Sequence, residues 1–258
     1  MNTDLLEAIS AENLNVYRAS PIRLREDVSQ EAQISNDYRG RLVYELLQNA
    51  DDAMSGQATA DYRIVFRLTD TDLWVGNSGR PLDEADVKGL CGIGISSKRE
   101  IVGRRRASIG HKGMGFKSVL EITAAPEIVS DNYSFRMAAE FARAPIDRLM
   151  EELGQHKPTR VPIMRFPSAL PTLPDYWHEF NATGIRTLFR FPLRPDLTGE
   201  PRSLLAQRLL SLPVTTILFL KHLDQVEVRA DTENRREGFS WKVRRERRVG
   251  DGWEPVQD

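Results

Sequence analysis

Residues 42–54 carry an amphipathic pattern that predicts one helix with two different faces. At about 100° per residue, the side chains of Glu45, Gln48, Asn49 and Asp52 fall within one arc of roughly 100°, and the apolar side chains fall opposite. One face predicts core packing, and the other gathers carboxylate and carboxamide groups. Oxygen ligands of this kind suit a hydrated Mg²⁺. A surface helix with solvated acids has the same pattern, so other motifs must decide between the two interpretations.

Composition favours a folded domain without a strong overall field. The chain has 258 residues, 40% of them hydrophobic, which is enough for one large domain or two small ones. A formal net charge of -1 gives no general attraction for nucleic acid or for a membrane, and we expect neither as a partner. The single cysteine, Cys91, excludes an internal disulfide and suits a reducing compartment. Without an apolar leader or spanning segment, we expect a soluble, cytoplasmic protein.

The remaining periodicities predict a mixed α/β arrangement. A leading helix over 1–20 ends at Pro21, and the amphipathic helix belongs to a helical stretch over 29–55 that is divided near 35–37. A hairpin of two strands, 62–68 and 72–77, is followed by a turn and a short helix over 83–90. We further expect strands at 127–130, 134–138, 161–166, 184–191 and 225–228, helices at 146–153 and 204–210, a helix or strand over 214–223, a connector at 167–174, and two arginine-rich strands over 239–253.

Two glycine-rich segments lie between the short helix and the later strands. Residues 91–98, with Gly103 and the arginines 104–106 after them, predict a mobile loop. Residues 109–120 hold three glycines in six residues, followed by a helical pattern. This arrangement brings bare backbone amides and a helix N-terminus against phosphate oxygens, although glycine-rich turns also occur in loops of every kind.

Together, these motifs resemble the GHKL ATPase superfamily, which includes Hsp90, gyrase B, MutL and histidine kinases. Within it, the chain is most similar to the sacsin and NO VEIN-type Hsp90-like domains. The resemblance covers residues 15–230 and rests on four segments: YELLQNADDA at 44–53, NSG at 77–79, GISSK at 94–98 and IGHKGMGFKS at 109–118. It implies a Bergerat-type α/β sandwich with a mixed, largely antiparallel sheet and an ATP lid over 91–118.

The family's site residues carry over at the matching positions. The resemblance implies that Glu45 is the general base that polarises the water attacking the γ-phosphate, and that Asn49 completes the Mg²⁺ shell. Asp52 matches a neighbouring helix carboxylate, and Thr187 matches a threonine that contacts the base through water. The implied nucleotide-binding residues are Asn49, Asp52, Asn77, Gly79, Ser97, Lys98, Gly110, His111, Lys112, Gly113, Met114, Gly115, Phe116, Lys117 and Thr187.

The chain departs from the family at the base-recognising motif. Much of the superfamily has an aspartate where this chain has Asn77, and a second glycine where it has Pro81. The aspartate accepts a hydrogen bond from the adenine 6-amino group. An asparagine can accept through its carbonyl oxygen but can also donate, so we expect adenine to remain favoured with weaker discrimination against guanine.

The implied function is slow Mg²⁺-dependent ATP hydrolysis that switches the conformation of the lid. Downstream domains or protein clients would sense this state, and a nucleotide-dependent dimer would fit the same role. An ATP-binding domain would occupy 1–230, and a β-rich extension or the start of a following domain would occupy 231–258.

Other functions remain open at this stage. The main alternative is a non-hydrolysing, nucleotide-dependent protein-interaction module. A histidine kinase would need a phospho-acceptor histidine on an upstream helix, which the chain does not show, and a gyrase- or MutL-type role would need a transducer domain beyond residue 258.

Overall fold

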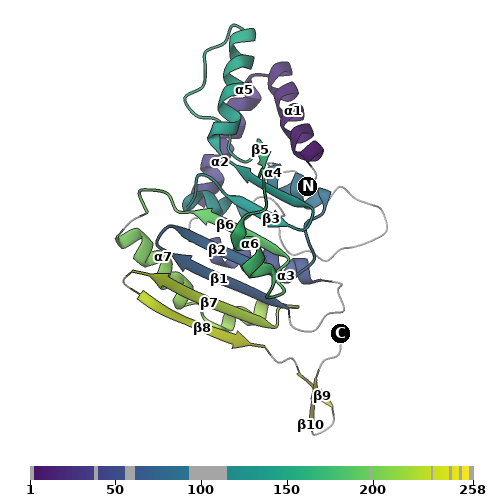
Figure 1. The fold of residues 1–258 in the computed structure, drawn as a ribbon, viewed down its shortest axis with the longest axis vertical. Coiled ribbons are helices and arrows are strands. Elements are labelled where there is room, and N and C mark those ends of the chain that lie inside the picture. Colours follow the sequence, from purple (N-terminus) through teal and green to yellow (C-terminus); the bar gives the residue numbers. More distant parts are fainter. Residues whose placement is uncertain are drawn as a thin grey trace.

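A mixed β-sheet with helices layered mainly on one face forms the centre of the protein (Figure 1). The computed structural model describes residues 3–37, 40–55, 62–92, 115–197, 199–233, 235–243, 246–249 and 252–255. The sheet has eight strands in the order β5-β4-β3-β6-β2-β1-β7-β8, and among these strands the β1–β7 pair is parallel while the other pairs are antiparallel. The strands are β1 Arg63–Thr69, β2 Asp72–Asn77, β3 Glu127–Ser130, β4 Tyr133–Met137, β5 Pro167–Ala169, β6 Thr187–Pro192, β7 Gln225–Thr232 and β8 Arg235–Lys242.

The helices and the sheet together give the expected two-layer α/β sandwich. The helix α3 lies against the sheet, and α1, α2 and α5 gather at one end of the molecule (Figure 1). The helical elements are α1 Thr3–Ala19, α2 Ile22–Asp37, α3 Leu42–Met54, α4 Glu84–Cys91, η1 Gly115–Glu121, α5 Ala139–Glu152, α6 Asp175–Asn181, α7 Glu200–Leu210 and η2 Val214–Phe219, where η marks a 3₁₀ helix. None of the helices in the described ranges has the length and apolarity needed to cross a lipid bilayer.

Alternation along β1 separates two apolar cores. Ile64, Phe66 and Leu68 point into the large core shared with α3, whereas Val65 points to the opposite face, where it belongs to a smaller cluster with Trp177 of α6. Successive side chains of a strand point to opposite faces, so one strand supplies both cores. The larger core fixes α3, and with it the polar face of that helix, over the sheet.

The expected helical stretch 29–55 is divided, as predicted, but its limits differ. The first helix, α2, begins earlier, at Ile22, and ends at Asp37. The second, α3, starts after Arg41, which occupies the N-cap position without a side-chain capping bond. The apolar face predicted from the sequence is buried in α3.

The strand expected over 161–166 is wrong. In the structure this segment has no strand, because the backbone amides of Ile163 and Met164 donate to the Glu31 carboxylate, each at 2.8 Å, instead of to a neighbouring strand. Strand β5 forms later, at Pro167–Ala169, inside the stretch expected to be a connector. Two helices also differ from the prediction: α5 begins at Ala139, before the expected 146, and α6 was not predicted.

The C-terminal region extends the sheet. Strand β8 pairs antiparallel with β7 and lies at the edge of the sheet (Figure 1). Strands β9 Glu246–Val249 and β10 Gly252–Pro255 form a separate two-stranded hairpin. The sheet therefore continues past residue 230, and the assignment of 231–258 to an extension or a following domain stays a prediction.

Candidate functional site

A cavity lies beside the polar face of α3. Its walls come from α3, the ends of β2 and β6, the 3₁₀ helix η1, and α4 with the segment that leads into it. It is lined by Asn49, Ala53, Asn77, Arg80, Leu82, Ala85, Asp86, Gly89, Leu90, Phe116, Thr187 and Phe189. Four of the residues implied by the sequence, Asn49, Asn77, Phe116 and Thr187, are thus brought to one cavity from four different elements.

Sheet register places the two polar residues at the floor of the cavity next to each other. Asn77, at the end of β2, is the register partner of Thr187, at the start of β6. Both side chains are almost completely buried. The register therefore places Thr187 beside Asn77.

The turn after β2 is held tightly against α3. The Gly79 amide donates to Asn77 Oδ1 at 3.1 Å, and the Arg80 amide donates to the Ala53 carbonyl at 2.9 Å. A Cβ atom on Gly79 would lie 2.9 Å from the carbonyl carbon and oxygen of Ala53, so glycine is needed for this close approach. These contacts fix Asn77 relative to the helix that carries Asn49.

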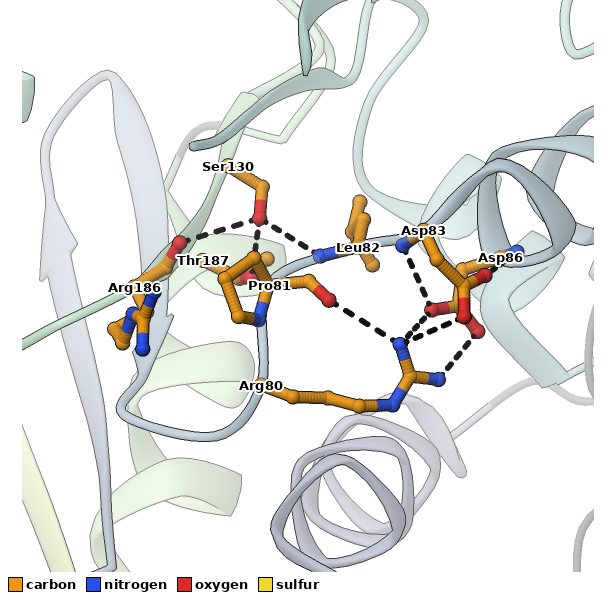
Figure 2. Close-up of polar contacts among 8 residues, drawn as sticks. All are labelled: Arg80, Pro81, Leu82, Asp83, Asp86, Ser130, Arg186 and Thr187. Carbon is orange, nitrogen blue, oxygen red and sulfur yellow. Dashed lines mark hydrogen bonds and ion pairs between the residues drawn. The ribbon is translucent and has the colours of Figure 1, made fainter. Parts of the chain in front are cut away.

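A group of hydroxyl hydrogen bonds supports Thr187 and Leu82, which both line the cavity (Figure 2). Ser130 Oγ lies 2.8 Å from Thr187 Oγ1, accepts a hydrogen bond from the Leu82 amide at 3.0 Å, and donates to the Arg186 carbonyl at 3.2 Å. Ser130 was not selected from the sequence, where a serine ending a short strand carries no signal of such a role. Its contacts join β3, β6 and the loop after β2.

An ion pair forms part of the cavity wall. The Arg80 guanidinium makes a two-pronged contact with the Asp86 carboxylate, at 2.5 and 2.9 Å, and also contacts Asp83 Oδ2 at 3.2 Å (Figure 2). Asp83 and Asp86 also form the capping box at the start of α4. The Arg80 side chain therefore ties the loop after β2 to α4, and the Arg80 backbone amide ties the same loop to α3.

Glu45 lies one helical turn before Asn49, against η1. A Cβ atom built on Gly115 would fall 1.8 Å from Glu45 Oε2, so the carboxylate occupies the space that any larger residue at 115 would need. Burial raises the pKa of this carboxyl above its usual value, and the Arg41 guanidinium opposes the change. A half-buried carboxylate with a raised pKa is suited to accept a proton from water.

The apolar wall of the cavity is aromatic. The Phe116 ring lies 5.4 Å from the Phe189 ring, and the two rings are tilted by 49°. Phe191 extends this group behind them. Such a surface can bury one flat face of an aromatic ligand.

Lys117 is not among the residues that the structure brings to the cavity. Its side chain is completely buried, and its Nζ donates to the Gly92 carbonyl at 2.5 Å. Burial lowers the pKa of Lys117 to about 8, while Glu31 opposes this change and Arg165 adds to it. Its implied contact with phosphate stays a prediction. In the structure the Lys117 side chain links η1 to Gly92 at the end of α4.

Asp51 has a role that the sequence analysis missed. This buried carboxylate accepts the backbone amides of Lys221, His222 and Leu223 at 3.0, 2.8 and 2.9 Å, and so holds the entry to β7 against α3. The available signal was an acidic residue on the apolar side of the helical pattern. The neighbouring Asp52 is half-buried and does not line the cavity.

Several implied residues lie outside the described ranges. These are Ser97, Lys98, Gly110, His111, Lys112, Gly113 and Met114, together with most of the expected lid. Gly115 is the first described residue of the glycine-rich motif, and it contacts Glu45 as stated above.

The donor set in the described residues fits a magnesium ion that is bound mainly through a nucleotide. No group of three or more His, Cys, Asp or Glu side chains is gathered there. Asn49 offers one carboxamide oxygen in the cavity. Because Mg²⁺ keeps several waters and is commonly held by one or two protein oxygens plus phosphates, this sparse set suits it.

Comparison with known proteins identifies the family. The sacsin domain model matches residues 28–239. The chain is also 30% identical to the protein NO VEIN of Arabidopsis thaliana over 152 residues, which are 59% of this chain and 5% of that protein. The chain therefore spans a small part of that relative's length. With the sacsin model covering α2 through β8, the chain belongs to the sacsin domain family.

Proposed function

We propose that this domain binds ATP with Mg²⁺ in the cavity beside α3, hydrolyses it slowly and changes conformation with the state of the nucleotide. The observation that carries the proposal is the meeting of Asn49, Asn77, Phe116 and Thr187 at one cavity, with Glu45 one turn away along the same helix. All five were selected from the sequence, and they come from four segments that are far apart in the chain.

Different walls of the cavity would contact the base, the magnesium ion and the attacking water. Asn77 and Thr187 would meet the polar edge of the base, while Phe116 and Phe189 would cover its face. Asn49 would ligate the magnesium ion, which when bound neutralises charge on the phosphates. Glu45 would take a proton from the water that attacks the γ-phosphorus, and its raised pKa suits this role.

Slow turnover fits a switch better than a metabolic enzyme. Lys117 donates to the Gly92 carbonyl, which joins the described residues on the two sides of residues 93–114. The state of the proposed lid would be sensed by downstream domains, protein clients or a second copy of the chain.

The test separates binding from chemistry. Glu45→Gln keeps the size of the side chain and removes the base, so we expect turnover to fall by about 100-fold or more while Mg·ATP affinity changes little. The matched control is Glu7→Gln, an exposed change on α1 that should leave both unchanged. Phosphate release and calorimetric titration measure the two quantities. Wild-type protein that binds ATP without turnover would leave only a nucleotide-dependent interaction module, and absence of ATP binding would refute the proposal.

A further inference from the structure

The orientation of the Asn77 carboxamide is fixed by a backbone donor. Its Oδ1 accepts the Gly79 N–H at 3.1 Å, and a backbone amide can only donate, so the oxygen and not the amine must face it. The turn that carries this amide is pinned to α3 through Gly79 and the Arg80–Ala53 bond. The carboxamide therefore cannot turn around without breaking this contact, and its Nδ2 amine is the end left for the cavity that Asn77 lines.

One order of hydrogens satisfies every polar atom of the hydroxyl hydrogen bonds around Ser130 shown in Figure 2. The Ser130 hydrogen is donated to the Arg186 carbonyl, and the two Ser130 lone pairs accept the Leu82 amide and the Thr187 hydroxyl. The 2.8 Å contact between the two hydroxyls admits either as the donor, and the inference takes this order. In this order Thr187 Oγ1 has only lone pairs left for the cavity.

The floor of the cavity thus presents a donor from Asn77 beside an acceptor from Thr187, on adjacent strands in register. A purine with oxygen at position 6 has the complementary edge, because O6 accepts and the neighbouring N1–H donates. Adenine has the reverse pattern, since its 6-amino group donates and its N1 accepts, so with position 6 facing Asn77 it sets donor against donor and acceptor against acceptor. When two donors or two acceptors face each other, the buried polar groups stay unsatisfied, and this weakens binding.

We infer that the site accepts 6-oxopurine nucleoside triphosphates at least as well as ATP, and that Asn77 sets this selectivity. The inference rests on the proposed function, because it takes the purine edge to lie against Asn77 and Thr187. The sequence alone predicts that asparagine in place of aspartate weakens discrimination against guanine. The structure adds the class of nucleotide that the asparagine would favour.

Inosine triphosphate is the sharpest probe, because it differs from ATP only at position 6 and in the N1 proton. We expect wild-type protein with Mg²⁺ to bind it at least as tightly as ATP, measured by calorimetric titration. Asn77→Asp supplies a second acceptor in place of the amine. The ratio of the affinity for ATP to that for inosine triphosphate should therefore rise by about tenfold or more. Asn181→Asp, the same change at an exposed position at the end of α6, should leave the ratio unaltered.

The outcomes separate the two proposals. Wild-type protein that binds ATP about tenfold tighter than inosine triphosphate would overturn the inference and leave the proposed function intact. An unchanged ratio in Asn77→Asp would remove Asn77 from base selection. Failure of both nucleotides to bind would refute the proposed function itself. The wild-type comparison needs no variant, so it decides whether 6-oxopurines are accepted even where Asn77→Asp does not fold.

Discussion

The carboxylate of Glu45 lies where a side chain on Gly115 would have to be. A Cβ atom at position 115 would fall 1.8 Å from Glu45 Oε2 and 2.7 Å from its Cδ. The first described residue of the glycine-rich motif therefore sets the place of the proposed base, through a contact between α3 and η1. A glycine that looks like a phosphate-loop residue in the sequence also makes room for the carboxylate.

Gly115→Ala should therefore displace Glu45 and slow turnover. The clash is with the end of a flexible side chain, so Glu45 can swing away and the fold should survive. We expect turnover to fall by about tenfold or more, with a small change in Tm. Phosphate release and thermal unfolding measure the two effects.

A double mutant supplies the control for this effect. If Gly115→Ala acts through Glu45, adding it to Glu45→Gln should cause little further loss of turnover. Additive losses would show that residue 115 affects turnover by another route.

Removing the Asp51 carboxylate should destabilise the join between α3 and β7. Asp51→Ala leaves the amides of Lys221, His222 and Leu223 without their acceptor in a buried setting. We expect the free energy of unfolding in urea to fall by about 3 kcal/mol. The same change at Asp4, which is exposed on α1, should cost about 0.5 kcal/mol or less. A similar small loss at Asp51 would contradict the anchoring role.

Lys117 should make stability depend on alkaline pH. Its pKa is lowered to about 8 in the folded protein from an ordinary value of 10.5, chiefly by burial. Between these two values the unfolded chain binds more protons than the folded one, so the free energy of unfolding should rise with pH across this window. Relative to Lys117→Met, the full rise should be about 3 kcal/mol.

Urea unfolding at several pH values from 7 to 11 measures this difference. The subtraction of Lys117→Met removes the contribution of tyrosines and other lysines, which titrate in the same range. Parallel curves for the two proteins would show that the buried Lys117 is not the group responsible.

Local patterns predicted the elements that have a regular period and a single partner face. The apolar stripe of α3 and the alternation of the β1–β2 hairpin were recovered, since side-chain burial follows from helix and strand geometry alone. The prediction of a strand over 161–166 was wrong because the backbone partners of this segment are not local. Most of its apolar residues are buried, but two of its amides donate to Glu31 from another part of the chain, and no local pattern records that contact.

The sequence by itself determined the family, the two faces of α3 and the candidate residues at 45, 49, 77, 116 and 187. The two faces of α3 follow from helical period, which is a local property, and the family and the candidate residues follow from the resemblance that local motifs carry. Only the tertiary structure decided that Asn77 and Thr187 are register partners, that Gly79 orients the Asn77 carboxamide, and that Ser130 contacts the Thr187 hydroxyl. Those features depend on which strands pair and where a turn meets a helix. Hydrogen-bond direction is fixed only when donor and acceptor from distant segments are brought together by packing.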